Sequence, residues 1–293
     1  MALGKNAVRD IVLLALGASL YTIASPPYEW AGAAWLALTP LFLVLRDRTP
    51  KTAFAAGLLY GVLCCAGIAY WVYFAVFAYF PFSFPLNFLF TLLSYSFFVG
   101  LYTGLAACLS CVLMRRGSAL LCWGGVPALW VSGEFARSSL FSGFSWELLG
   151  YTQYRHLTFV QITDITGVYG LSFLIALSGY VAAETLNSLR LCRSAIRNPQ
   201  SAITLRIPWP AVGCLAVGVA LVLLYGTMRL RQYPPTPSAP AVTVALVRVD
   251  EPSVQRWNRV HYASTLLRYI SITNRGIEGA RPDLVISFAP LRR

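Results

Sequence analysis

Charged side chains are scarce in this sequence: Asp, Glu, Lys and Arg make up only 12% of the 293 residues, against 57% hydrophobic residues. A soluble domain of this length could not keep so many apolar side chains covered in one core. The scarcity of charged residues therefore excludes an ordinary soluble protein and favours an integral membrane protein.

Acidic residues are scarcer still, with 11 Asp and Glu against 23 Lys and Arg, which gives a formal net charge of +12. In a soluble protein that excess would suggest nucleic acid as a partner. Membrane proteins collect Lys and Arg in their cytoplasmic loops. We therefore expect a membrane, and no nucleic acid, as the partner of these charges.

Metal-ligating side chains are few and scattered. The sequence has two histidines, and its only Cys-x-x-Cys spacing, Cys108 and Cys111, lies inside an apolar run. Structural zinc sites need four such ligands brought together. We therefore expect no bound metal and no cofactor, and we interpret most of the seven cysteines as small apolar side chains.

Long apolar runs are what the sequence does contain, and several reach the ~20 residues that cross a bilayer core. They predict an α-helical polytopic membrane protein with about seven transmembrane helices, whose transmembrane domain covers residues 1–228. The runs are 11–24, 30–45, 53–80, 85–113, 119–135, 160–186 and 207–228.

The basic residues support this arrangement. With the N-terminus in the cytoplasm, eleven Lys and Arg fall on that side, whereas the opposite short loops hold only Arg137 and Arg155. Such a bias is typical of polytopic membrane proteins, and an odd number of spans then places the C-terminal segment across the membrane. The eleven are Lys5, Arg9, Arg46, Arg48, Lys51, Arg115, Arg116, Arg190, Arg193, Arg197 and Arg206.

The residues after the last apolar run have a different character. Four prolines mark residues 229–240 as a linker. Residues 241–247 and 284–286 are apolar enough for strands, and Val260, Ala263, Leu267 and Ile270 recur between them at helical spacing. Residues 241–293 therefore predict the β-α-β start of an α/β domain, which is incomplete because two strands and one helix cannot cover a sheet on both faces.

Two ionisable residues lie near the end of the fifth apolar run. Glu134 and Arg137 are three residues apart, so on a helix they share a face and can pair. Ionisable groups at membrane depth are costly and often functional. Two interpretations stay open, namely an ion pair that fixes the helix and the following loop, and contact with a substrate.

A stretch rich in glycine, aromatic and polar residues follows, from Gly143 to Phe173. Irregular backbone at a membrane edge survives only where protein buries it or where it lines a cavity, which fits both a lipid pocket and a transporter gate. The motifs of this stretch resemble the membrane domain of apolipoprotein N-acyltransferases. The similar residues are Gly143, Trp146, Leu149, Gly150, Tyr151, Gln153, Gln161, Asp164, Gly167, Tyr169, Gly170, Ser172 and Phe173, with support from Pro26, Pro27, Pro40, Leu41, Val244, Ala245, Leu246, Val247, Gln255, Arg256 and Trp257.

This resemblance implies a bacterial inner-membrane enzyme of lipoprotein maturation with a periplasmic nitrilase-like domain. In such an enzyme a cysteine takes an acyl chain from a phospholipid as a thioester and passes it to the N-terminal diacylglyceryl-cysteine of a lipoprotein. A glutamate acts as base and a lysine steadies the oxyanion. The resemblance also makes Trp146, Tyr151 and Gln153 candidate substrate-binding residues, with Glu134 and Arg137 holding the backbone around them.

The catalytic residues of that family have no counterparts in this sequence. The family's glutamate follows the second soluble strand, where this sequence has Ala289, and its lysine and cysteine lie beyond the position of Arg293. All seven cysteines precede the soluble segment. We therefore expect no catalytic residue here, a chain that is truncated or frameshifted at its C-terminal end, and a separately encoded catalytic half as the partner that would restore activity.

Two other functions stay open on the sequence alone. One is a membrane lipid-binding protein or a partner subunit of a split enzyme. The other is a small-molecule transporter, which would favour an internal repeat or paired broken helices, and the sequence shows no such repeat.

Overall fold

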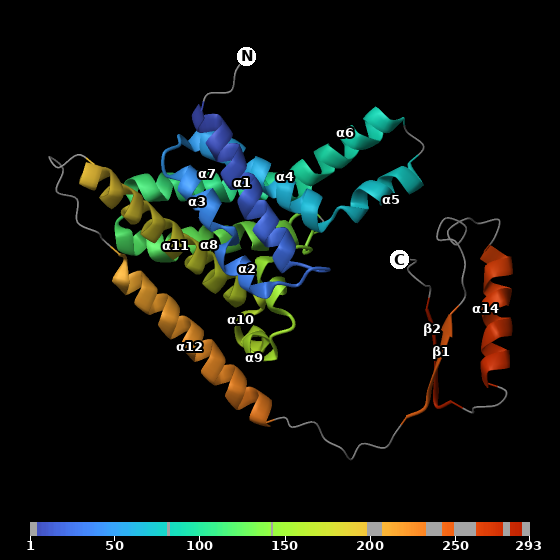
Figure 1. Ribbon diagram of the computed structural model, residues 1–293. Coiled ribbons are helices and arrows are strands. Elements are labelled where there is room, and N and C mark those ends of the chain that lie inside the picture. The colour runs from blue at the N-terminus through green and yellow to red at the C-terminus, as the bar shows by residue number, and fades with distance from the viewer. Residues whose placement is uncertain are drawn as a thin grey trace. The chain divides into compact units, whose positions relative to one another are not determined.

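The computed structural model describes residues 5–80, 83–141, 143–197, 207–232, 242–248, 262–277 and 282–288. Contacts divide the chain into two units (Figure 1). One unit consists of residues 1–76 and 82–233, and the other consists of residues 77–81 and 234–293. Each unit is described by itself.

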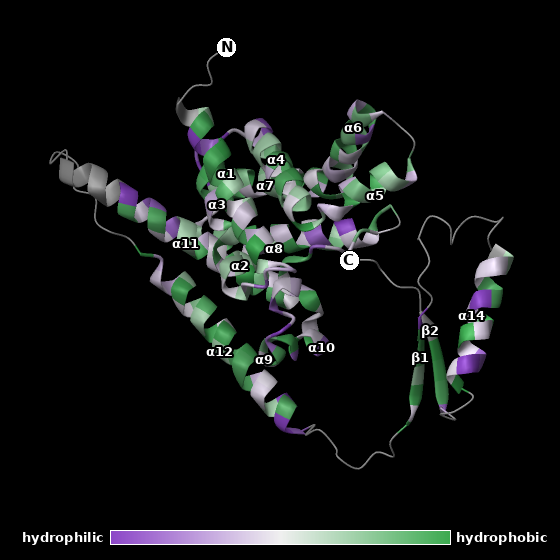
Figure 2. Cartoon of the chain, turned by 45° about the vertical axis from the view of Figure 1, so that its right-hand side comes forward, coloured by the Kyte–Doolittle hydropathy of each residue, from purple (hydrophilic) through white to green (hydrophobic). Residues whose placement is uncertain are grey.

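Six helices among the described residues are long and apolar enough to cross a membrane, one fewer than the expected number. Their hydrophobic residues extend along most of their length (Figure 2). The six spans are Ala7–Ala24 within α1 (Lys5–Ala24), α4 (Pro50–Ile68), the joined elements α6 (Phe84–Tyr95), η1 (Ser96–Gly100) and α7 (Leu101–Arg116), α8 (Ala119–Ser139), Val168–Arg190 within α11 (Val168–Arg197), and α12 (Trp209–Gln232).

The expected span at 30–45 is instead a broken pair of short helices, α2 (Ala31–Ala37) and α3 (Thr39–Leu45). Pro40 lies in the first turn of α3, where it lacks the N–H that would continue α2. Every residue of α3 is buried. Protein rather than lipid therefore surrounds α3, which explains why this segment tolerates a break and a length below that of a bilayer core.

The α2–α3 pair runs back along α1. The amide of Trp30, just before α2, donates to the Ile23 carbonyl near the end of α1, at 2.9 Å. Arg48, just after α3, forms an ion pair with Asp10 near the start of α1. The pair therefore connects the two ends of the bundle although neither of its helices is long.

Two other expected spans are also divided. The run at 53–80 breaks after α4, at Ala69 and Tyr70, before α5 (Trp71–Tyr79) begins. The run at 160–186 begins with α9 (Leu157–Val160) and α10 (Thr163–Thr166), and the long helix α11 starts only after Gly167. Gly167 has φ 62°, a left-handed conformation that glycine adopts without strain and that ends α10.

Small residues set the close packing of α4 against α7. A Cβ atom on Gly57 would approach the Ala107 Cβ to 2.5 Å, and one on Gly61 would collide with the Thr103 hydroxyl. Thr103 in turn donates to the Gly57 carbonyl at 2.9 Å. Glycine at both positions therefore lets the two helix backbones approach closely, as is common for helices packed in membranes.

The second unit contains a two-stranded parallel sheet, in which β1 (Val244–Arg248) pairs with β2 (Leu284–Phe288), and a connecting helix, α14 (Tyr262–Ile277). This β-α-β order agrees with the expectation. The linker predicted to begin at residue 229 is helical through Gln232, and the rest of it, 233–240, lies outside the described residues, as do Ala241, Val260, Gln255–Trp257, Arg206 and Ala289.

One face of this small sheet is bare. Val244 and Leu246 are 41% and 66% exposed, and their partners across the ladder, Leu284 and Ile286, are 49% and 42% exposed. On α14, Leu267 and Ile270 are exposed as well. The helical spacing correctly predicted α14, but it does not mark a buried face, because the described residues of this unit are too few to cover both sides.

Candidate functional site

The five predicted site residues divide into a buried and an exposed group. Glu134 and Arg137 lie in the last turns of α8 at 5% and 4% exposure, and Gln153 ends η2 (Leu149–Gln153) at 2%. Trp146 and Tyr151 are 50% and 45% exposed. Trp146 belongs to residues 140–148, which we call the aromatic loop, and the other four lie in the elements on either side of it, α8 and η2; Ser142 of the loop lies outside the described residues.

Glu134 holds the end of the aromatic loop. Its Oε1 accepts a hydrogen bond from the Trp130 indole N–H at 3.1 Å and another from the Leu149 amide at 2.8 Å. Leu149 follows the loop, 15 residues further along the chain. A buried carboxylate thus satisfies a backbone donor that would otherwise have no partner.

Arg137 holds the same loop at two other points. Its Nη2 donates to the Glu147 carbonyl at 2.9 Å, and its own carbonyl accepts from the Phe144 amide at 2.8 Å. The guanidinium also lies 6.0 Å from the centre of the Phe144 ring, within the range of a cation–π interaction. Arg137 therefore fixes the course of the loop.

An ion pair between Glu134 and Arg137 is absent from the ion pairs that the structure describes. Each side chain binds loop backbone instead. The i,i+3 spacing places both residues on one helix face, but the backbone groups of the aromatic loop compete for the same side chains. These contacts agree with the interpretation in which the two residues fix the following loop, and contact with a substrate stays a prediction.

Glu147 belongs to the same cluster, and sequence reasoning did not single it out. It has φ 59°, an uncommon conformation for a residue other than glycine. Neither carboxylate oxygen accepts a hydrogen bond in good geometry, and the Cys65 thiol, a weak donor, lies beside them. Burial raises the pKa of this carboxyl, and the charge of Arg137 opposes that rise. The signal in the sequence that could have identified Glu147 is its charge, since it lies between the apolar residues Trp146 and Leu148.

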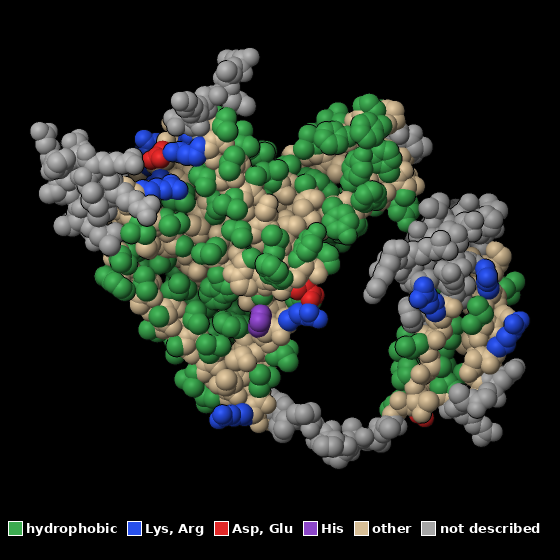
Figure 3. Space-filling view, in the orientation of Figure 1, with side chains coloured by type: hydrophobic (Ala, Val, Ile, Leu, Met, Phe, Trp, Pro, Cys, Tyr) green, Lys and Arg blue, Asp and Glu red, His purple; other side chains and the backbone are tan. Residues whose placement is uncertain are grey.

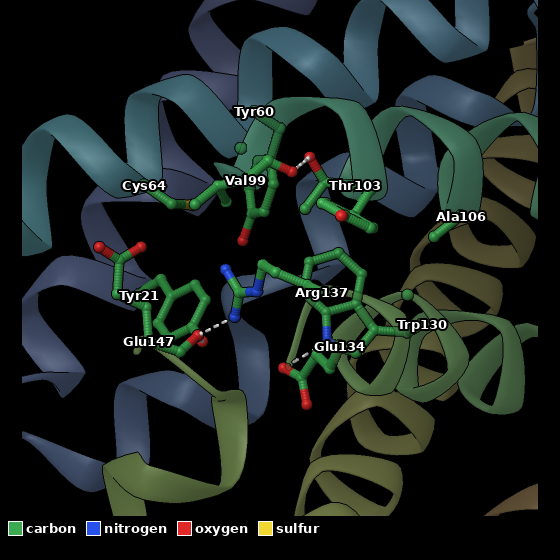
Figure 4. A pocket seen from close by; sticks show the side chains of 13 residues that line it. Tyr21, Tyr60, Cys64, Val99, Thr103, Ala106, Trp130, Glu134, Arg137 and Glu147 are labelled. Atoms are coloured by element: carbon green, nitrogen blue, oxygen red, sulfur yellow. Dashed lines mark hydrogen bonds between the residues drawn. The ribbon is translucent and has the colours of Figure 1, made fainter. Parts of the chain in front are cut away.

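Glu134, Arg137 and Glu147, which we call the polar anchor, line a cavity of about 20 Å³ together with Tyr21, Tyr60, Cys64 and seven other residues (Figure 4). The Tyr21 hydroxyl donates to the Glu147 carbonyl at 2.6 Å. Several polar atoms here are buried without a hydrogen bond in good geometry: Glu134 Oε2, Arg137 Nε and both oxygens of Glu147. The space fits about one water molecule and is too small for an acyl chain.

Gln153 joins the end of the loop region to the start of α2. Its amide nitrogen donates to the Ala31 carbonyl and to the Thr152 hydroxyl, both at 3.0 Å. Both bonds are made within the protein, and the side chain is almost fully buried. The geometry therefore gives Gln153 a role in packing the irregular segment.

Aromatic contacts attach the exposed side of the loop to neighbouring helices. The Trp146 ring lies 5.0 Å from Trp71 of α5 and 5.2 Å from Phe144. Phe144 in turn lies 5.4 Å from Phe98 of η1. Because Trp146 is held at one edge and half exposed at the other, it presents a fixed aromatic surface outside the bundle.

The surface of the helical unit supports a membrane setting. Its visible face is mostly hydrophobic, and charged side chains gather in a few groups toward its margins (Figure 3). Among the described residues, no group of three or more His, Cys, Asp or Glu side chains could hold a metal ion. Membrane-length helices around a buried polar anchor define the class: an α-helical polytopic membrane protein.

Comparison with known proteins identifies the family. A family model described as the apolipoprotein N-acyltransferase N-terminal domain matches residues 17–181, which include the polar anchor, the aromatic loop and η2. The chain therefore belongs to the apolipoprotein N-acyltransferase family, and the expected resemblance is confirmed.

Relatives named apolipoprotein N-acyltransferase extend the match. That of Geobacter metallireducens is 33% identical over 282 residues, which cover 95% of this chain and 50% of the relative. The relative from Coxiella burnetii is 30% identical over 77% of this chain and 48% of its own length. The relative from Azotobacter vinelandii is 31% identical over 94% of this chain and 50% of its own length. The chain spans about half the length of the curated relatives it matches.

Proposed function

We propose that this chain is the membrane half of a lipoprotein N-acyltransferase of the bacterial inner membrane. It would admit a phospholipid acyl donor and a diacylated lipoprotein acceptor, while acyl transfer occurs in a nitrilase-like domain that residues 241–293 only begin. The observation that carries the proposal is the family match over 17–181, because it includes the anchored loop and the membrane helices around it.

The excess of Arg and Lys at one end of the bundle supports an orientation in which the N-terminus is cytoplasmic and the C-terminal unit periplasmic. Arg48 pairs with Asp10, and Arg46 pairs with Glu184, at the basic end of the bundle. Because the α2–α3 pair connects both ends, six long spans and this pair make seven crossings. Protease added outside sealed, right-side-out vesicles should cut after Arg231 and spare the 190–206 loop, and the reverse pattern would invert the orientation.

The bare face of the β1–β2 sheet supports a partner for residues 241–293. Strands of parallel sheets are ordinarily buried on both faces, whereas Val244, Leu246, Leu284 and Ile286 are exposed here. Further strands and helices, in the same chain or in a second polypeptide, would cover them. A partner subunit of a split enzyme is therefore the second candidate function.

Acyl transfer should require more than these 293 residues, because no cysteine follows Cys214. In vesicles with radiolabelled phospholipid and a diacylated lipopeptide, we expect neither a labelled protein nor a triacylated product from this polypeptide alone. Adding the C-terminal half of the Geobacter relative should yield product, and the full-length relative is the positive control. A covalent acyl label on residues 1–293 alone would contradict the proposal.

Trp146 should contribute to phospholipid binding, because the loop holds its half-exposed ring outside the bundle. Trp146→Ala should lower the amount of phospholipid retained on the purified protein by about fivefold at limiting lipid. Trp209→Ala is the matched control, since Trp209 is also exposed but lies on α12. Equal retention by the two variants, at wild-type level, would assign Trp146 to packing alone. The same comparison applies to Tyr151.

A further inference from the structure

A groove separates α7 from α8 near the turn that joins them. It has a volume of about 510 Å³ and is open along one side. Its lining is apolar except at two positions, Arg116 and Ser132. From α7 and the turn come Leu109, Val112, Leu113, Arg116 and Gly117, and from α8 come Leu121, Gly125, Ala128, Leu129 and Ser132.

Small residues on α8 leave this space open. A Cβ atom on Gly125 would lie 2.5 Å from Leu113 Cδ2, so glycine lets the leucine side chain lie flat against α8. Ala128, one turn further along, adds only a methyl group. Ser132 donates its hydroxyl to the Ala128 carbonyl of its own helix at 2.8 Å, so it offers the groove little polarity. The groove is therefore shaped for an apolar chain.

Arg116 places a positive charge at one end of the groove. Its side chain is exposed and has no hydrogen bond or ion pair among the described residues. Its neighbour Arg115, by contrast, lies outside the groove lining and reaches the Arg48 carbonyl at 3.5 Å. An apolar trough that ends at a free guanidinium complements a molecule with an apolar tail and an anionic head.

We propose that the α7–α8 groove binds one anionic phospholipid, with an acyl chain along the groove and the phosphate at Arg116. Basic side chains near a membrane surface attract anionic lipids, and guanidinium groups suit phosphate because they donate two parallel hydrogen bonds. This lipid is not an acyl donor. It lies at the basic end of the bundle, whereas the aromatic loop lies with Glu29 and Arg155 toward the other end.

The test measures binding of phosphatidylglycerol and phosphatidylcholine to the purified full chain in mild detergent, by native mass spectrometry. We expect wild type to prefer phosphatidylglycerol. Arg116→Gln should weaken phosphatidylglycerol binding about fivefold and phosphatidylcholine binding by less, because the choline of that headgroup already offsets its phosphate charge. Arg115→Gln removes the same charge outside the groove lining and should have little effect. Equal losses in the two variants would overturn the proposal in favour of diffuse surface attraction.

A second variant tests the groove itself. Ala128→Phe should fill it and weaken binding of both lipids, whereas Ala216→Phe, at an exposed position of α12, should not. Because both alanines are exposed, neither change disturbs the core. Phosphatidylglycerol binding that survives Ala128→Phe would refute the groove as the site. Inorganic phosphate should compete weakly, and full competition would show that the acyl chain contributes nothing, which also contradicts the proposal.

Discussion

Replacing Arg137 with alanine should destabilise the helical unit by about 3 kcal/mol and release the aromatic loop. The variant loses the bond to the Glu147 carbonyl and leaves the buried Glu147 carboxyl without its neighbouring cation. Thermal unfolding in detergent would measure the first effect, and the part of the tryptophan fluorescence that Trp146→Phe removes would measure the second. Arg155→Ala is the control, because Arg155 pairs with Glu29 at the surface, where ion pairs contribute little.

The free energy of unfolding should depend on pH, and the raised pKa of Glu147 sets the direction of that dependence. Burial raises the pKa of Glu147, so the folded protein holds this proton more tightly than the unfolded chain does. Stability should therefore be greatest below about pH 4 and should fall as pH rises through the folded-state pKa. Arg137→Ala should enlarge the total fall and extend it to higher pH, because it removes the charge that opposes the rise in the pKa of Glu147.

A double-mutant cycle separates this interaction from general damage. Glu147→Gln should remove this pH dependence. The double variant should be more stable than Arg137→Ala alone by about 1 kcal/mol or more in its free energy of unfolding. Additive losses that do not vary with pH would show that the two side chains act independently, and would contradict the polar anchor as a coupled unit.

Replacing Glu134 with alanine should cost about 3–5 kcal/mol, the larger of the two effects. The change leaves the Trp130 indole N–H and the Leu149 amide buried with no acceptor. Glu134→Gln keeps an acceptor oxygen in place and should cost about 1 kcal/mol. Thermal unfolding measures both variants.

Ser138→Ala serves as the control on the same helix, since it removes only a bond to the Glu134 carbonyl. Equal melting temperatures for Glu134→Ala and Ser138→Ala would mean that loop backbone does not depend on the carboxylate. The alanine variant should also lose protection of the Leu149 amide from hydrogen exchange, which the glutamine variant retains.

Much of the helical unit was predictable because apolar run length reflects bilayer thickness. The runs that became α1, α7, α8 and α12 were each recognised in this way. The run at 30–45 was misread as a single span because length and hydropathy do not show that protein buries α3 on all sides. Such burial comes from tertiary packing, which one sequence does not encode locally.

The candidate site was predictable in its location and less so in its contacts. The glycines and aromatics of residues 143–153 correctly indicated irregular backbone at this point. The partner of Glu134 could not be read from spacing, because that partner is the amide of Leu149 across a loop. Glu147 was missed for a related reason: its left-handed backbone conformation, which turns the carboxylate inward, has no sequence signature at a glutamate.

The uncovered β1–β2 sheet has a consequence for handling the protein. Among the described residues, β1 and β2 pair only with each other, which leaves an outer edge on each strand, and alternate side chains on one face are apolar. The edge strand of one copy can therefore pair with the edge strand of another copy, which is how intermolecular sheets begin. We therefore expect self-association through the exposed face of β1 and β2, and a yield of monodisperse protein that depends on covering this face during synthesis.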